Sequence, residues 1–145
     1  MKVYPDANVF ITYLLGQKGE QTADRFFKQG IGCRFSIVAS KVMFAEVAKR
    51  CGQDGIILLQ KSIDGLQNAG KLEIVDYAPD EVEEAYAAVM KMSASIGRND
   101  ALHSILSKKY ADILVTDDRD LARFASKAQK VMGLAEFVDS KPQPP

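Results

Sequence analysis

The 145-residue chain has very little of the side-chain chemistry on which many enzymes depend, with two cysteines and one histidine. Cys33, Cys51 and His103 are too few for a zinc site or a disulfide scaffold, so we expect the cysteines to pack as small apolar side chains. The sequence also lacks Gly-x-Ser-x-Gly and any complete P-loop motif, in which Ser or Thr follows Gly-Lys. Serine-hydrolase and P-loop functions therefore have no support.

Long apolar runs and excess charge are absent as well. No run approaches the ~20 residues of a membrane-spanning helix, and residues 1–6 lack the apolar region of a signal peptide, which predicts a cytoplasmic protein. The formal net charge is zero, with 19 basic and 19 acidic residues. Tight nonspecific binding of nucleic acid is therefore not expected. Between residues 98 and 130, however, seven basic residues stand against five acidic ones, so a cation on the acids would make this region net basic.

The pattern of apolar residues predicts alternating strands and helices. The expected strands are Lys2–Tyr4, Arg34–Val38, Leu72–Val75, Ile113–Val115 and Lys130–Met132. The expected helices are Asn8–Leu15, Glu20–Gln29 with Gly30 as its stop, a helix from the N-cap Ser40 to Arg50, Gly55–Asn68, Pro79–Ser95, Asp100–Lys109 with Asn99 as its cap, and Leu121–Ala128. In the helix after Pro79, the predicted buried stripe consists of Val82, Ala85, Tyr86, Val89 and Met90.

Alternating strands and helices are typical of a three-layer α/β/α sandwich with a central, mostly parallel sheet. The length fits one domain with a substantial core, and we place this domain at residues 1–139. The proline-rich tail, residues 140–145, is expected to be disordered.

Acidic residues follow two of the predicted strands. Asp6 follows the first, and Asp117, Asp118 and Asp120 follow the fourth. Because ligands of parallel α/β sheets collect beyond the carboxyl ends of the strands, these acids are expected at one edge. Asp6 could instead cap a helix, as could Asn8. Three acids after the fourth strand exceed what capping requires, and they repel one another unless a cation is bound.

Two further acids lie on predicted helices. Glu46 has almost exclusively apolar neighbours, so its carboxylate needs a cleft, a metal or a basic partner. Asp100 begins a helix, where the helix dipole alone favours an acid. Thr116 could orient a nearby carboxylate through a hydrogen bond. The lone His103 receives no role from the sequence.

Taken in order, these motifs resemble the PIN domain. The resemblance rests on Asp6-x-Asn8 after the first strand, Glu46 on a helix, Asp100-Ala101-Leu102-His103 at a helix start, and Leu114-Val115-Thr116-Asp117-Asp118-Arg119-Asp120. It covers nearly the whole chain and is nearest to the small prokaryotic VapC-type toxins. Pro5, before the first Asp, and Leu121, where Phe is frequent, depart from the family pattern.

The resemblance implies a Mg²⁺- or Mn²⁺-dependent endoribonuclease, which would be the toxin of a toxin–antitoxin pair. By position, the catalytic and metal-binding acids are Asp6, Glu46, Asp100 and Asp118, with Asp120 as an additional metal ligand and with Asn8 and Thr116 as supporting residues. The implied partners are RNA, an antitoxin protein and a second copy of the chain. Asp117 competes with Asp118 for the role of principal ligand.

Two alternatives stay open at this stage. One is a PIN-fold binding module without catalysis. The other is a metal-dependent phosphatase with an Asp nucleophile, although Asp6-x-Asn8 departs from the Asp-x-Asp pattern of haloacid-dehalogenase-like enzymes.

Overall fold

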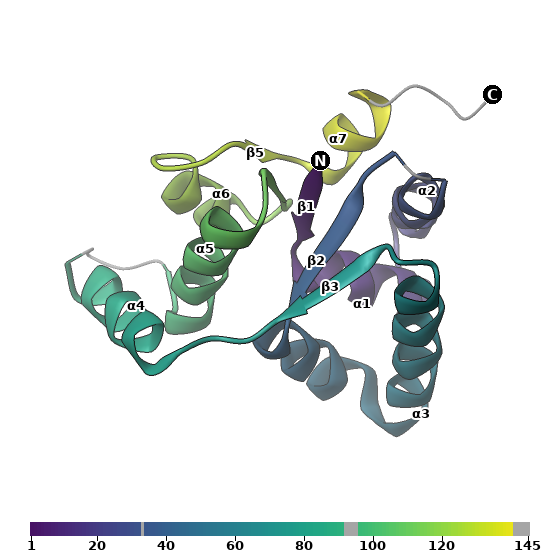
Figure 1. Cartoon of the computed structure of the whole chain (residues 1–145), viewed down its shortest axis with the longest axis horizontal. Coiled ribbons are helices and arrows are strands. Elements are labelled where there is room, and N and C mark those ends of the chain that lie inside the picture. Colours follow the sequence, from purple (N-terminus) through teal and green to yellow (C-terminus); the bar gives the residue numbers. More distant parts are fainter. Residues whose placement is uncertain (33, 92–95, 141–145) are drawn as a thin grey trace.

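The computed structural model describes residues 1–32, 34–91 and 96–140, to which all structural statements refer. Five strands form a parallel sheet in the order β3-β2-β1-β4-β5 (Figure 1). The strands are β1 (Lys2–Pro5), β2 (Ser36–Ser40), β3 (Leu72–Val75), β4 (Ile113–Val115) and β5 (Val131–Met132). The helices are α1 (Ala7–Leu15), α2 (Glu20–Ile31), α3 (Lys41–Asn68), α4 (Pro79–Lys91), α5 (Arg98–Tyr110), α6 (Arg119–Ala125) and α7 (Leu134–Ser140).

The helices cover both faces of the sheet, as the sequence predicts. Helices α4, α5 and α6 lie on one face, and α1, α2, α7 and the second half of α3 lie on the other (Figure 1). The central strands are buried on both sides, so β4 is entirely apolar in its sequence Ile-Leu-Val and entirely buried. The chain changes direction across the sheet between β1 and β4, which are neighbours. The carboxyl ends of these two strands therefore define the edge at which ligands of such sheets bind.

The last helix packs against the rest of the fold through aromatic rings. Phe137 of α7 lies with its ring centroid 5.7 Å from that of Phe26 on α2 and 5.1 Å from that of Phe35 next to β2. All three side chains are buried, and such ring pairs add to the stabilisation that burial gives. Helix α7, Leu134–Ser140, was not among the predicted helices. Residues 141–145 lie outside the described ranges.

Most element boundaries agree with the predictions, and the differences have local causes. Helix α2 continues through Gly30, which was predicted to end it. Gly30 instead makes room for the ring of Phe35, because a Cβ at this position would lie 3.2 Å from a carbon atom of that ring. The two helices predicted around Gly52 form α3, in which Gly52 is non-helical, with φ 68° and ψ −169°. Helix α5 begins earlier than predicted, with Gly97 rather than Asn99 at its N-cap. Strand β2 lies two residues later than predicted.

Helix α4 differs from its prediction in the width of its buried face. Tyr86 and Met90 were expected inside but are 51% and 83% exposed. The helix packs chiefly against α5, and one neighbour covers only a narrow stripe, which includes Ala85. The predicted end of this helix near Ser95 lies outside the described residues.

Two remaining sequence features carry no site. Residues 65–71 read Gly-x-x-x-x-Gly-Lys, but Leu72 follows, and the segment comprises the last four residues of α3 and the turn before β3. A P-loop has the opposite order, strand before helix. Cys51 is half-buried and free, as expected of a packing residue, whereas Cys33 lies outside the described ranges. In the described part of the chain, no helix is long and apolar enough to cross a membrane.

Candidate active site

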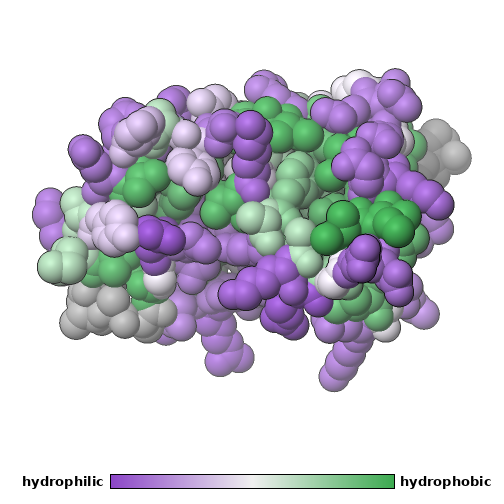
Figure 2. Space-filling model, turned by 90° about the horizontal axis from the view of Figure 1, so that it is seen from below, coloured by the Kyte–Doolittle hydropathy of each residue, from purple (hydrophilic) through white to green (hydrophobic). Residues whose placement is uncertain are grey.

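Four of the predicted acids line one cleft at the carboxyl ends of the strands. Asp6 follows β1, Asp118 follows β4, Glu46 comes from α3 and Asp100 from α5. The cleft has a volume of about 270 Å³ and is also lined by Ala7, Asn8, Ile11, Lys49 and Arg50. Figure 2 views the molecule from the side towards which the strands run, and hydrophilic residues surround a hollow near the centre of that face. The arrangement therefore brings together residues that are more than 110 positions apart in the sequence.

The half of the cleft formed by the strand ends is organised by Thr116. Its hydroxyl donates a hydrogen bond to Oδ2 of Asp6 (2.8 Å) and accepts one from the backbone N–H of Asp118 (3.0 Å). Thr116 is buried, and Asp6 is only 7% exposed. One hydroxyl therefore sets the position of both acids, as expected of a supporting residue.

Burial disfavours the ionised form of the Asp6 carboxyl. Removal from water raises the pKa of its carboxyl above the usual range, while the Thr116 hydrogen bond acts in the opposite direction. Although Asp6 occupies the N-cap position of α1, its side chain makes no capping hydrogen bond. The backbone N–H of Asn8 nevertheless acts on this carboxyl and lowers its pKa, so Asp6 both stands at a capping position and lines the cleft.

The structure separates Asp118 from its neighbour Asp117. Asp118 lines the cleft, and its Oδ1 caps α6 by accepting hydrogen bonds from the backbone N–H groups of Asp120 and Leu121. Asp117 instead turns to the start of α7, where its Oδ1 accepts a hydrogen bond from the N–H of Leu134 (3.0 Å). Geometry therefore favours Asp118 over Asp117 as the acid of this site.

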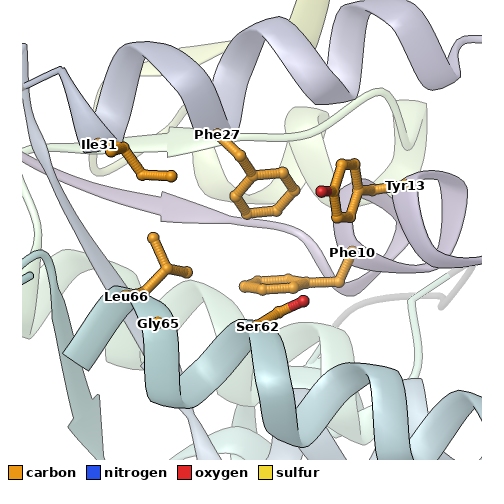
Figure 3. A pocket seen from close by; sticks show the side chains of 7 residues that line it. All are labelled: Phe10, Tyr13, Phe27, Ile31, Ser62, Gly65 and Leu66. Carbon is orange, nitrogen blue, oxygen red and sulfur yellow. The ribbon is translucent and has the colours of Figure 1, made fainter. Parts of the chain in front are cut away.

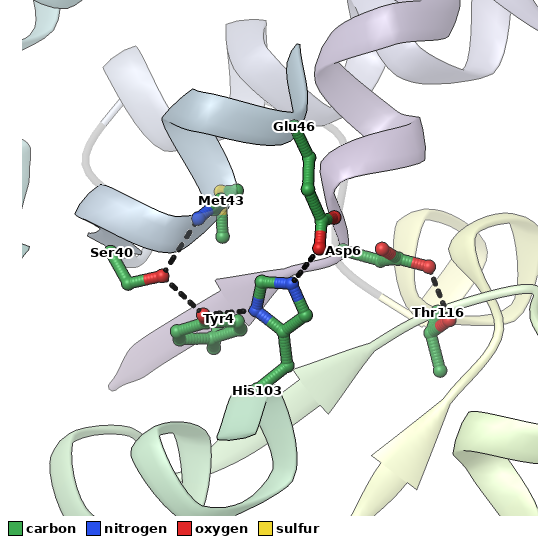
Figure 4. A network of polar contacts seen from close by, with 7 residues as sticks. All are labelled: Tyr4, Asp6, Ser40, Met43, Glu46, His103 and Thr116. Carbon is green, nitrogen blue, oxygen red and sulfur yellow. Dashed lines mark hydrogen bonds and ion pairs between the residues drawn. The ribbon is translucent and has the colours of Figure 1, made fainter. Parts of the chain in front are cut away.

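The helical half of the cleft contains Glu46 and a partner that sequence reasoning missed. The Nε2 atom of His103 lies 3.1 Å from Oε1 of Glu46, and its Nδ1 atom lies 2.7 Å from the hydroxyl of Tyr4 (Figure 4). His103 is 1% exposed. The signal that could have identified it is weak: His103 stands one helical turn after Asp100 and thus on the same face of α5. Tyr4 gives no signal at all, because it reads as an ordinary strand residue.

Asp100 is the least supported of the four acids. Its side chain makes no hydrogen bond with the described residues. Burial, and next the negative charge of Asp118, raise the pKa of its carboxyl. Two other predicted site residues differ in placement. Asn8 lines the cleft, whereas Asp120 is not among its lining residues.

The donor set fits a hard divalent cation, within limits. Carboxylate oxygens are the ligands such ions prefer, and the raised pKa values of Asp6 and Asp100 mark a place where added positive charge is favourable. As the side chains lie, no group of three His, Cys, Asp or Glu residues in the described ranges is close enough to enclose an ion. Mg²⁺ commonly binds through one or two carboxylates and keeps several waters. The acids of the cleft are thus a donor set for a hydrated ion, which needs few protein ligands.

The basic residues at the cleft are not those that the sequence highlighted. Lys49 and Arg50 of α3 line the cleft and are exposed. None of the seven basic residues between positions 98 and 130 does so; three of them, Lys108, Lys109 and Lys127, line a separate groove. Lys49 and Arg50 were missed although they follow Glu46 by three and four residues, the spacing of helical neighbours.

A second hollow, of different chemistry, lies between α1, α2 and the end of α3. Its lining is aromatic and aliphatic, as Figure 3 shows for Phe10, Tyr13, Phe27, Ile31 and Leu66. Ile31 at its rim is 56% exposed. This hollow, with a volume of about 160 Å³, is the apolar counterpart of the acidic cleft.

Comparisons with known proteins agree with this architecture. The sequence model of the PIN domain matches residues 3–127, whereas a comparison with curated proteins finds no match. Among solved structures, VapBC2 from Rickettsia felis, bound to a promoter DNA fragment, matches with a TM-score of 0.66 and 17% identity over 92% of this chain and 98% of that chain.

Two further structures have similar scores. The Mycobacterium tuberculosis toxin VapC20, which cleaves the sarcin-ricin loop, matches with a TM-score of 0.66 and 15% identity over 83% of this chain and 93% of its own. FitAB bound to a DNA fragment matches with a TM-score of 0.62 and 16% identity over 92% and 95%. At identities this low, the three matches show a likeness of fold alone.

Proposed function

Because this chain belongs to the PIN domain family, we propose that it is a Mg²⁺- or Mn²⁺-dependent endoribonuclease and the toxin of a toxin–antitoxin pair. The observation that carries the proposal is the convergence of Asp6, Glu46, Asp100 and Asp118 on one cleft. Family membership removes the haloacid-dehalogenase-like phosphatase from consideration. The catalytically silent binding module remains the rival that experiment must exclude.

The residues of the cleft would have different roles in phosphodiester hydrolysis. Asp6 and Asp118, positioned through Thr116, and Glu46 and Asp100 from the helices would hold the cation, and Asp120 stays a predicted additional ligand. A bound Mg²⁺ or Mn²⁺ supplies the Lewis acidity that such hydrolysis needs. Lys49 and Arg50 place positive charge beside the acids, where they can bind backbone phosphates of RNA on either side of the cut. Asn8 can donate hydrogen bonds from its amide at the mouth of the cleft.

The first test is cleavage of a labelled single-stranded RNA with Mg²⁺, with Mn²⁺ and with EDTA. Adjacent residues provide a matched pair of variants. We expect Asp118→Asn to lower the cleavage rate at least about 100-fold, since it removes a charge from the cation site. Asp117→Asn should cleave like the wild type, because an asparagine oxygen can still accept the hydrogen bond from Leu134.

The result that contradicts the nuclease is the absence of cleavage in every metal together with the absence of any metal-dependent rise in melting temperature. A ligand that binds only the native state must raise apparent stability. A protein that neither cleaves RNA nor binds Mg²⁺ or Mn²⁺ is the silent binding module.

The proposal includes two protein partners, an antitoxin and a second copy of the chain. The apolar groove of Figure 3 supports the first, because it offers an apolar antitoxin segment a preformed site. The exposed Tyr86 and Met90 of α4 support the second. Two structural relatives are themselves named as paired complexes, VapBC2 and FitAB.

Two surface variants separate these contacts. We expect Ile31→Asp to prevent binding of the protein encoded by the neighbouring reading frame while leaving the dimer intact. Met90→Asp should prevent formation of the dimer while leaving the binding of that protein intact. Size-exclusion chromatography with light scattering measures both. If neither complex responds to its variant, the assigned surfaces are wrong.

A further inference from the structure

Behind Glu46 lies a buried row of hydrogen bonds that nothing in the proposed chemistry requires. The backbone N–H of Met43 donates to Oγ of Ser40 (3.1 Å), which lies 2.7 Å from the hydroxyl of Tyr4. That hydroxyl lies 2.7 Å from Nδ1 of His103, whose Nε2 lies 3.1 Å from Glu46 (Figure 4). Ser40, Tyr4 and His103 are at most 1% exposed. The row therefore runs from the first turn of α3, through β1 and α5, back to the same helix.

One end of this row has a fixed direction. A carboxylate only accepts, so the 3.1 Å contact with Glu46 requires a proton on Nε2 of His103. At the other end, Oγ of Ser40 accepts from the N–H of Met43. For a neutral ring, Tyr4 donates to Nδ1 and Ser40 donates to Tyr4, and all bonds then point towards Glu46. The donor to Glu46 is Nε2–H whichever direction the two middle bonds take.

Glu46 is bonded to His103 and not to the basic residues that follow it on α3. Lys49 and Arg50 follow it on α3 at the spacings at which Glu and a basic residue normally pair, and Glu before the basic residue is the favoured order. Among the described residues, however, neither Lys49 nor Arg50 makes an ion pair with a carboxylate. The Glu46 side chain is 31% exposed and bonded to His103. Glu46 is thus held at the cleft, and both cations stay unpaired.

We propose that His103 is a positioning residue, whose Nε2–H holds the Glu46 carboxylate at the acidic cleft and away from Lys49 and Arg50. The inference rests on the proposed function, since it gives a purpose to the position of Glu46. It goes further by assigning a role to the histidine and to the Ser40–Tyr4 pair behind it. The two cations then remain free for the phosphates of the RNA.

The first test needs neither metal nor substrate. The chain has a single histidine, so protein labelled with ¹⁵N-histidine, purified without a histidine tag, gives ring signals from this residue alone. We expect a long-range ¹H–¹⁵N spectrum in EDTA to show a protonated Nε2. An unprotonated Nε2 would overturn the proposal, because such a ring cannot donate to Glu46. This readout is independent of cleavage, so it remains informative if the nuclease proposal fails.

The second test compares two replacements of the ring. Gln can place a side-chain N–H near the position of Nε2, whereas Leu fills the space without a donor. We expect His103→Leu to weaken Mn²⁺ binding, measured by electron paramagnetic resonance, and to lower kcat about 10-fold. His103→Gln should recover most of both losses. Thermal unfolding in EDTA checks that each variant folds. Equal metal affinity and equal kcat in the folded Leu and Gln variants would reduce His103 to a packing residue.

Discussion

The two halves of the acidic cleft are supported in different ways. At the strand ends, Thr116 contacts Asp6 directly and Asp118 two residues further along the chain. At the helices, Glu46 depends on His103, which is 57 positions away, and on Tyr4, which is 99 positions from His103. Only the Thr116–Asp118 bond is local, and its Thr-x-Asp spacing is visible in the sequence. The Thr116–Asp6 bond, which spans 110 positions, and the whole of the second support exist only once the strands and helices have packed together. A motif therefore identifies acids more readily than it identifies what holds them.

The strand-end half should be the more sensitive of the two, because one hydroxyl serves two acids. We expect Thr116→Val to lower the free energy of unfolding by about 1–3 kcal/mol, since it removes one hydrogen bond from the buried Asp6 and another from the backbone N–H of Asp118. The cleavage rate should fall about 10- to 100-fold, the usual loss when the support of a metal ligand is removed. Chemical denaturation and the RNA cleavage assay measure the two effects.

Thr116→Ser is the matched control, because it keeps the hydroxyl and loses only a methyl group. It should cleave within a few-fold of the wild type. Should the Val variant cleave as well as the Ser variant, the orientation of Asp6 by this hydroxyl would be irrelevant to function. The difference between the two halves of the cleft would then lose its meaning.

The same difference explains how far the sequence could predict this protein. The parallel sheet and the edge at which acids gather follow from local patterns, whereas the set of four acids was predicted from the resemblance to the PIN domain. The choice of Asp118 over Asp117 came only from the resemblance, since both acids follow β4. Their different contacts, Asp117 with Leu134 of α7 and Asp118 with the start of α6 and the cleft, exist only in the packed fold. Helix α7 itself was missed, because seven residues next to a proline-rich tail give a weak periodic signal. Long-range contacts decide each of these cases.

Burial in the interior was also misjudged for a physical reason. The apolar period of α4 predicts a wide buried stripe that includes Tyr86 and Met90, yet only one helix covers it. For His103, to which the sequence assigned no role, the contacts with Tyr4 and Glu46 appear only in the packed fold. The number of neighbours that an element acquires is a property of the packed fold, and periodicity alone does not contain it.

Replacing Asp100 should have the smallest effect on stability. Within the helical half of the cleft, Glu46 is bonded to His103, whereas the side chain of Asp100 has no hydrogen-bond partner among the described residues. Burial and the charge of Asp118 raise the pKa of its carboxyl in the folded state. The ionised form is therefore less favourable folded than unfolded. In EDTA at pH 7.5 we expect Asp100→Asn to be more stable than the wild type by on the order of 1 kcal/mol, as is common for replacements in functional sites. Thermal unfolding measures the gain.

The sign of the pH dependence makes this prediction specific. Below the ordinary pKa of about 3.9 the carboxyl is protonated in both states, so wild type and variant should be equally stable. As the pH rises through the raised pKa of the folded state, the wild type loses stability that the variant keeps, and the difference then stays constant. Saturating Mg²⁺ should remove it, because the cation stabilises the ionised carboxyl. The exposed Asp54 is the control, and Asp54→Asn should change stability at neither pH. A variant less stable than the wild type at pH 7.5 in EDTA would mean that the helix dipole of α5 outweighs burial and repulsion at this acid.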